Sequence, residues 1–415
     1  MSLTVLYRDQ IVGTLSLNSR ARMIFNYDPN WLRSSIRFPI STSLPFSGKY
    51  IQGKDDHNFF ANLLPEAGAR EGICRSLGIS RDNDYNLLSA IGGECAGALC
   101  IIPKISEAVQ AESYEAISEE ILKKAIETHI PYTRFAAAGK LRLSLAGAQD
   151  KWPVLYRDNQ LFWPLGNSPS SHILKFTNQN FKGLNWNEAY TSFLALNLGL
   201  PVIDVIVKQD YTLTKRYDRI VDHHGDLKRL HQEDFCQALG YSPFTKYEAE
   251  GGPNLKICIE LIRSISIAPA EDVVHLLNWH IFNLLAGNSD GHAKNLSIIY
   301  TQNGPRLAPF YDLVCTRIYP DISSDLAFSV GASHDPGHIQ ERDWQNLANQ
   351  LEINPRLLFR LLTTMIGKIE TNLDSFQQEF LENAGNNPVI ERINLFVKKQ
   401  SRRTKTLLRS IVAPG

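Results

Sequence analysis

The sequence predicts an α+β fold in which strands dominate the amino-terminal part and helices the carboxy-terminal part. Short apolar runs of the kind that form paired strands occur early in the chain, at 3–7, 11–17 and 22–27. Apolar residues recur at helical spacing in four later segments, 273–284, 341–351, 356–373 and 389–411. The chain has 415 residues, of which 43% are hydrophobic, and this is enough for two or three domains with buried cores.

Composition excludes several classes of protein. Lysine plus arginine and aspartate plus glutamate number 43 each, so no overall charge indicates a nucleic-acid or membrane partner. The six cysteines form no CxxC pair, which is typical of reduced thiols in the cytosol. Arg8 and Asp9 interrupt the stretch where a signal peptide would be apolar, and no uncharged run reaches membrane-spanning length. We therefore expect a soluble cytoplasmic protein.

The first 103 residues are expected to form a small α+β domain. After the three strands, we predict a helical region from Asn58 that restarts near Pro65, a helix over 84–91 and a closing strand over 97–102. The composition of this domain favours a packing or recognition module over a catalytic one. Residues 104–134 are predicted to be a linker that carries one amphipathic helix.

The candidate chemistry lies in two segments, Asn288–Asn295 (NSDGHAKN) and Pro309–Asp312 (PFYD). A helix is predicted to end just before the first segment, and a β-hairpin is predicted between the two. Asp290 would then deprotonate an attacking hydroxyl, while Asn295 and Asp312 would hold magnesium at the two ends of the hairpin. Protein kinases place these parts around Mg-ATP. Asp and Asn also cap and turn ordinary loops, so the motif alone leaves a purely structural role open.

Two lysine-containing segments are candidates for contacts with phosphate groups. Small residues at 146–148 would let backbone N–H groups approach phosphate oxygens, and Lys151 would add charge. An ordinary hairpin turn would have the same composition. Lys175 ends an apolar strand, as does the kinase lysine that contacts the α- and β-phosphates, and Glu188 is a candidate helical partner for it. A lysine on an edge strand that faces water is the alternative.

Taken in order, these motifs resemble the HipA family, bacterial serine/threonine protein kinases that act as toxins in type II toxin–antitoxin modules. The resemblance covers nearly the whole chain, because several independent motifs match in register. The matching segments are 59–66 (FFANLLPE), 92–99 (GGECAGAL), 144–151 (SLAGAQDK), 172–175 (HILK), 216–219 (RYDR), 231–237 (HQEDFCQ), 246–253 (KYEAEGGP), 288–295 and 309–312.

The resemblance implies a two-lobed protein-kinase-like fold related to the lipid kinases. It divides the chain into an amino-terminal HipA-type domain, a helical linker, a kinase N-lobe-like region with the phosphate loop and a helical C-lobe with the catalytic loop, at 1–103, 104–134, 135–218 and 219–415. It implies ATP and Mg2+ as cofactors, with Asp290 as the proton acceptor and Asn295 and Asp312 as metal ligands. The residues implied to line the nucleotide are Ala146, Gly147, Ala148, Gln149, Asp150, Lys151, Lys175, Lys215, Arg216, Tyr217, His292, Ala293, Lys294, Asn295, Tyr311 and Asp312.

The resemblance also has implications for regulation at Ser144 and for ATP binding at Lys215. Ser144 would be the autophosphorylated residue of the phosphate loop. A dianionic phosphate there would repel the triphosphate of ATP and expel the loop, which would switch activity off. Lys215 stands where a glutamate is common in the family, and ATP binding should survive because contacts to adenine at this hinge are largely made by the backbone.

The family also implies partners. A helix-turn-helix antitoxin (HipB-like) would neutralise the toxin and bind operator DNA with it, giving a complex that represses its own operon. The acceptor would be a cellular protein, with an aminoacyl-tRNA synthetase as one candidate, and its phosphorylation would arrest growth. The basic residues of the last predicted helix fit a solvated face better than a DNA contact. No membrane partner is expected.

Two other functions stay open. Small-molecule phosphotransferases share an Asp-x4-Asn and a later Asp, although the segments at 144–151, 231–237 and 246–253 resemble HipA proteins specifically. A catalytically inactive kinase fold that serves as a corepressor is the second alternative. Intact Asp290, Asn295, Asp312 and Lys175 favour an active enzyme over it.

Overall fold

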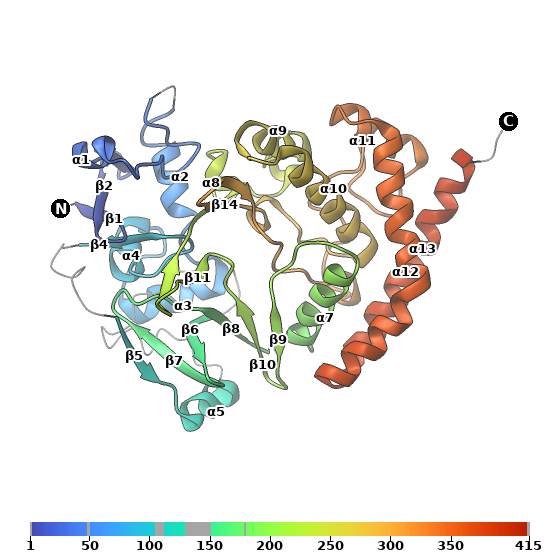
Figure 1. The fold of residues 1–415 in the computed structure, drawn as a ribbon, viewed down its shortest axis with the longest axis horizontal. Helices are drawn as coiled ribbons and strands as arrows, with labels where there is room; N and C mark the ends of the chain where they lie inside the picture. Colours follow the sequence, from blue (N-terminus) through green and yellow to red (C-terminus); the bar gives the residue numbers. More distant parts are fainter. Residues whose placement is uncertain (1, 48–49, 104–111, 129–150, 178–179, 413–415) are drawn as a thin grey trace. The chain divides into compact units, whose positions relative to one another are not determined.

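The computed structural model describes residues 2–47, 50–103, 112–128, 151–177 and 180–412, and for 409–412 it describes the backbone alone. The chain forms two compact units, and neither is one continuous segment (Figure 1). The first unit comprises Met1–Phe176, Leu213–Phe244 and Ser297–Gln302, and the second comprises Thr177–Thr212, Thr245–Leu296 and Asn303–Gly415. Residues 219–244, which the sequence assigned to the helical lobe, therefore belong to the first unit.

A four-stranded antiparallel sheet begins the first unit, with strand order β3-β2-β1-β4. The predicted hairpin is confirmed, since Leu3 pairs with Leu15 and Thr4 with Thr14. The helical region does restart near Pro65, because α2 ends at Ala61 and α3 begins at Ala67. The elements of this part are β1 (Leu3–Tyr7), β2 (Gln10–Leu17), β3 (Met23–Tyr27), α1 (Pro29–Arg33), α2 (Asp55–Ala61), α3 (Ala67–Leu77), α4 (Asp84–Ile91) and β4 (Leu99–Ile102).

A second sheet in this unit runs in the order β5-β7-β6-β8-β10. The turn between β6 and β7 places Asp158 and Asn159 at φ angles of 52° and 59°, the left-handed pair that a tight hairpin requires. Part of the predicted linker is itself an edge strand, because Ser113–Ala116 pairs with β7. The elements are β5 (Ser113–Ala116), α5 (Glu119–Thr128), β6 (Lys151–Arg157), β7 (Gln160–Leu165), β8 (His172–Phe176) and β10 (Tyr211–Lys215).

Two strand pairs complete the first unit. The strand β11 pairs antiparallel with β12, and β13 pairs antiparallel with β14. Asp234 caps the short helix α8 through the backbone N–H of Gln237, whose side chain accepts from the Asp234 N–H in return. The elements are β11 (Arg219–Val221), β12 (Leu227–Arg229), β13 (His231–Asp234), α8 (Phe235–Ala238) and β14 (Ser297–Thr301).

The second unit is mainly helical, as the carboxy-terminal periodicity predicts. Its two longest helices, α12 and α13, lie side by side (Figure 1), and Lys398 and Lys405 on α13 pair with Asp374 and Glu370 on α12. The elements are α7 (Leu184–Asn197), β9 (Val205–Val207), η2 (Glu248–Glu250), α9 (Leu255–Ile265), α10 (Pro269–Ala286), η3 (Ala293–Asn295), β15 (Gly304–Leu307), η4 (Thr316–Ile318), α11 (Glu341–Gln350), α12 (Pro355–Ala384) and α13 (Pro388–Val412). Among the described helices, none has the length and apolarity needed to cross a bilayer.

A buried carboxyl joins three segments of the first unit. Glu233 on β13 accepts hydrogen bonds from the Ser41 hydroxyl (2.5 Å), the Thr42 N–H (3.2 Å) and the Tyr300 hydroxyl (2.5 Å). Burial, which outweighs these hydrogen bonds, raises the pKa of Glu233 to about 7. Folding therefore favours the protonated carboxyl.

We predict that Glu233 makes the folded state lose stability as pH rises. A pKa raised on folding contributes stability that is fully present below the unfolded pKa, near 4.3, and that is lost by about pH 7. Between pH 5 and pH 8, the free energy of unfolding of the wild type should fall by about 1–3 kcal/mol relative to that of Glu233→Gln. Urea unfolding at both pH values measures this difference. The exposed Glu260→Gln variant should follow the wild type at both, and a constant difference for Glu233→Gln would contradict the prediction.

Candidate active site

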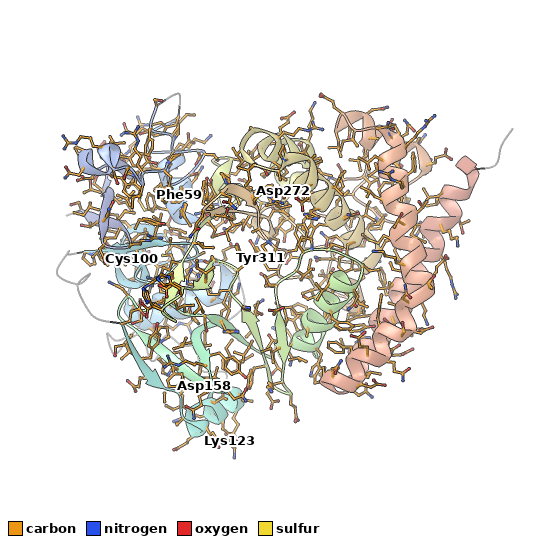
Figure 2. The ribbon with its side chains drawn as sticks, in the orientation of Figure 1. Phe59, Cys100, Lys123, Asp158, Asp272 and Tyr311 are labelled. Atoms are coloured by element: carbon orange, nitrogen blue, oxygen red, sulfur yellow. The ribbon has the colours of Figure 1, made fainter. Side chains whose placement is uncertain are left out.

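The helix α10 carries the candidate catalytic loop at its carboxyl end and is anchored at both ends. At its start, the carboxylate of Asp272 (Figure 2) accepts from the Ser266 hydroxyl (2.5 Å), the Leu307 N–H (3.0 Å) and the Arg306 guanidinium (2.8 Å from Nη2 to Oδ1). An aspartate in the first turn of a helix also opposes the helix dipole favourably. At its end, Gly287 adopts φ 74°, the left-handed conformation that terminates the helix. These contacts therefore fix the position from which the loop leaves α10.

Hydrogen bonds from buried side chains then shape the loop. The backbone carbonyl of Asn283 on α10 accepts from the Asn288 N–H (2.8 Å), and its side-chain oxygen accepts from the Asn288 side-chain amide (3.1 Å). Asn288 in turn accepts from the Asp290 N–H (3.1 Å), and Thr316 accepts from the Ser289 N–H (2.9 Å). Ser289 is buried, whereas the Asp290 side chain is 60% exposed. The loop therefore presents one accessible carboxylate on a rigid base.

Gly291 follows Asp290 for a steric reason. A Cβ at this position would lie 2.4 Å from Nδ2 of Asn283 and 3.3 Å from the ring of Trp279. The loop passes too close to α10 for any side chain here, so this glycine permits a close approach of the backbone.

Two neighbours contact the Asp290 carboxylate. The Tyr247 hydroxyl donates to Oδ1, and Nε2 of His292 lies 3.8 Å from the same oxygen. His292 and Lys294, both predicted to line the nucleotide, are buried, as is Ala293.

A hydrogen bond within the second unit joins the two segments that carry the predicted metal ligands. The Tyr311 hydroxyl donates to the carbonyl oxygen of Lys294 (2.8 Å), and these residues directly precede Asp312 and Asn295. Figure 2 labels Tyr311. Asp312 has φ 53°, a left-handed conformation that costs a residue other than glycine free energy and is found at functional sites more often than elsewhere. The segment before it is held by backbone bonds between Phe310 and residues 201 and 203.

The donor set suits a hard cation. An amide oxygen and a carboxylate are ligands of the kind Mg2+ uses when phosphate oxygens and water complete its shell. Oδ1 of Asn295 accepts from the His292 N–H at 3.3 Å, and a second lone pair on that oxygen is left for a cation. The described residues contain no group of three or more His, Cys, Asp or Glu side chains placed to hold a metal ion.

The first unit carries the predicted phosphate-binding lysines. Lys151 on β6 is the register partner of Lys175 on β8, so both side chains leave the same face of the sheet. Lys175 is only 4% exposed. Glu188, the predicted partner of Lys175, is buried in α7 of the second unit.

The predicted hinge, Lys215–Tyr217, contributes Arg216 to a buried ion cluster. Glu94 is fully buried and accepts from the guanidinium groups of Arg216 (3.0 Å), Arg219 (2.8 Å) and Arg229 (2.9 Å from Nε), and from the Ser170 N–H (3.0 Å). Burial alone would raise the pKa of Glu94, but the three guanidinium groups outweigh it and hold this pKa well below its usual range. The Arg216 guanidinium also contacts Asp218 (2.7 Å), so a contribution of Arg216 to nucleotide binding would come from its backbone.

The remaining predicted site residues lie outside the described residues. These are Ser144 and the phosphate-loop positions Ala146, Gly147, Ala148, Gln149 and Asp150. Of the others, the structure gathers Asp290, His292 and Asn295 in the second unit, with Tyr311 and Asp312 on the adjoining segment. The lysines at 151, 175 and 215 lie in the first unit. Their convergence with Asp290 on one nucleotide stays a prediction.

Sequence reasoning missed the side chains that support the loop. Asn283, Thr316 and Tyr247 carried no assigned role, although Tyr247 lies in one of the matching motifs, 246–253. Asn283 faces inward from a helix whose apolar spacing predicts only a core, and the polar residue in that apolar run was the available signal.

An Asp-x4-Asn loop at the end of a helix, with a second aspartate after the next hairpin, defines a protein of the kinase-like class in a mixed α/β fold. Comparison with known proteins gives the family. The model of the HipA-like C-terminal domain matches residues 143–373, and the model of the HipA N-terminal domain matches residues 3–102. The chain belongs to the HipA family, as the sequence resemblance predicted.

Individual relatives agree with this assignment. The chain is 31% identical to the serine/threonine-protein kinase toxin HipA of Shewanella oneidensis over 377 residues, which cover 87% of this chain and 86% of that protein. It is also 36% identical to the Sinorhizobium fredii protein Y4mE, which is named as a kinase. That alignment has 424 positions, gaps included, and covers 99% of each chain. The HipA fold in a solved Shewanella oneidensis complex of HipA, HipB and operator DNA matches with a TM-score of 0.81 at 27% identity, covering 100% of both chains.

We predict that Glu94→Gln strongly destabilises the first unit. Removing the charge takes away the counterion that Arg216, Arg219 and Arg229 share, and only the first two also pair with Asp218. Breaking such a buried pair costs about 3–5 kcal/mol. Urea unfolding at pH 7 measures this, because a carboxyl with a lowered pKa contributes its stability above the unfolded pKa and loses it only as pH falls towards the folded one. Glu271→Gln breaks an exposed pair with Arg306 and should change stability by less than about 1 kcal/mol. Equal effects of the two substitutions would contradict the prediction.

Proposed function

We propose that this chain is an ATP-dependent serine/threonine protein kinase and the toxin of a toxin–antitoxin module. The observation that carries the proposal is the loop geometry of the second unit, in which an exposed Asp290 lies on a rigid loop whose end is joined to the segment of Asp312. Family membership and the relatives that bear kinase names support it. A helix-turn-helix antitoxin is the expected partner, because the matched HipA structure is a complex with HipB and operator DNA.

In the proposed reaction, the Asp290 carboxylate orients the acceptor hydroxyl and takes its proton. The acceptor oxygen forms a bond to the γ-phosphorus of ATP, the bond from that phosphorus to the β,γ-bridging oxygen breaks, and ADP leaves. Asn295 and Asp312 would hold Mg2+, which when bound neutralises charge on the phosphate oxygens. Lys175 and Lys151 would supply the remaining positive charge at the phosphates.

The acceptor side of the proposal follows the family. We propose a cellular protein as acceptor, with an aminoacyl-tRNA synthetase as one candidate, growth arrest as the consequence, and autophosphorylation of Ser144 as the internal off-switch. The inactive corepressor remains the second candidate, since the likeness to a toxin–antitoxin–operator complex alone would fit it. ATP turnover separates the two.

We predict that Asp290→Asn lowers phosphoryl transfer by about 10²–10⁴-fold, because an amide of the same size cannot accept the proton. The measurement is incorporation of label from γ-labelled Mg-ATP into the protein and into cell extract, and growth arrest on expression should disappear in parallel. Asp374→Asn removes an exposed carboxylate on α12 and serves as the control that keeps wild-type activity.

Two other outcomes of this experiment would contradict the proposal. Wild-type rates in Asp290→Asn would remove Asp290 from the mechanism. No ATP turnover by the wild type, together with intact operator binding beside the antitoxin, would replace the kinase with the corepressor.

A further inference from the structure

The segment 245–253 (TKYEAEGGP) has no part in the function proposed so far, yet a tight turn and several hydrogen bonds define its conformation. Gly251 has φ 84°, and a Cβ on Gly252 would lie 2.7 Å from the carbonyl oxygens of both Thr245 and Tyr247. The Gly252 N–H donates to the Tyr247 carbonyl (2.8 Å). Two adjacent glycines therefore allow a turn that folds the chain back onto Tyr247.

Further hydrogen bonds fix this segment within the second unit. Glu248 accepts from the Ser329 N–H (2.8 Å) and hydroxyl (2.9 Å), and its own N–H donates to the Ala327 carbonyl (3.3 Å). On the other side of Tyr247, the Lys246 carbonyl accepts from the Ala293 N–H (3.4 Å), inside the catalytic loop. The backbone of Tyr247 is thus held on both sides.

The Tyr247 side chain ends on the catalytic carboxylate. Its hydroxyl donates to Oδ1 of Asp290, and its ring meets the His292 ring edge to face, with centroids 5.0 Å apart and planes at 84°. Within the described part of the chain, Oδ2 of Asp290 makes no hydrogen bond. One oxygen is therefore held while the other remains available to an acceptor hydroxyl.

We propose that Tyr247 is a positioning residue that orients the Asp290 carboxylate for phosphoryl transfer. This inference rests on the proposed kinase function. An aspartate that is 60% exposed would otherwise sample several rotamers, and a base that must be aligned with an acceptor hydroxyl loses rate when it does so. The phenol hydroxyl fixes the carboxylate through a hydrogen bond and brings no charge of its own.

The test is Tyr247→Phe in the full chain, which removes the hydroxyl and keeps the ring against His292. Incorporation of label from γ-labelled Mg-ATP should fall about 3- to 30-fold, while the Kd for Mg-ATP stays within about two-fold and the melting temperature is unchanged. Tyr156→Phe, which removes a phenol hydrogen bond to Asn159 (2.7 Å) in the β6–β7 hairpin, should leave all three quantities at wild-type values.

A second comparison separates positioning from a structural role. In an Asp290→Asn background, Tyr247→Phe should cause no further loss of rate, because its effect acts through the carboxylate. A further loss of the same size, or a parallel fall in ATP affinity and melting temperature, would overturn the inference. So would a Tyr247→Phe rate equal to the wild type. A wild type without any turnover would remove the kinase proposal itself, and this inference with it.

Discussion

The buried carboxylate of Glu94 is the constraint on which the first unit depends. It lies in the turn before β4, in the part of the chain that matches the HipA N-terminal domain, and its three arginine partners lie in residues 216–229 of the part that matches the C-terminal domain. Glu94 and Asp218 are buried with Arg216 and Arg219, and Arg229 is largely buried beside them. Buried charges are tolerable only when they are paired, so these two stretches must fold together. The part that matches the HipA N-terminal domain is therefore packed into the same compact unit as residues 213–244.

The same carboxylate also reaches the strands that carry candidate site residues. Ser170, which donates to Glu94 through its N–H and its hydroxyl, lies shortly before β8 and Lys175. Arg216 directly follows β10 and Lys215. Glu94 thus fixes where β8 begins and where β10 ends. A residue with no expected chemistry, more than 70 positions before either segment, sets the geometry of both.

Local patterns predicted much of the fold and part of the site. Hairpin composition predicted β1 and β2, and the apolar spacing of α10 with its terminal glycine predicted where the candidate catalytic loop begins. The pairing of β13 with β14 was not predicted, because it joins residues some 65 positions apart and periodicity does not report such contacts. Glu94 lies 122 positions from Arg216, and Tyr247 lies 43 positions from Asp290, so no local pattern predicts either contact.

Two departures from local rules in the second unit lie at the candidate chemistry. Asp312 takes a left-handed backbone without being glycine, and Asp290 is exposed although Ser289 and His292 beside it are buried. An inactive scaffold would gain nothing from either feature, since a relaxed Asp312 and a buried polar partner for Asp290 would be more stable. Their occurrence beside a hydroxyl that holds only one carboxylate oxygen fits the proposed kinase function. It is harder to explain for a kinase fold that has kept its shape solely to bind an antitoxin.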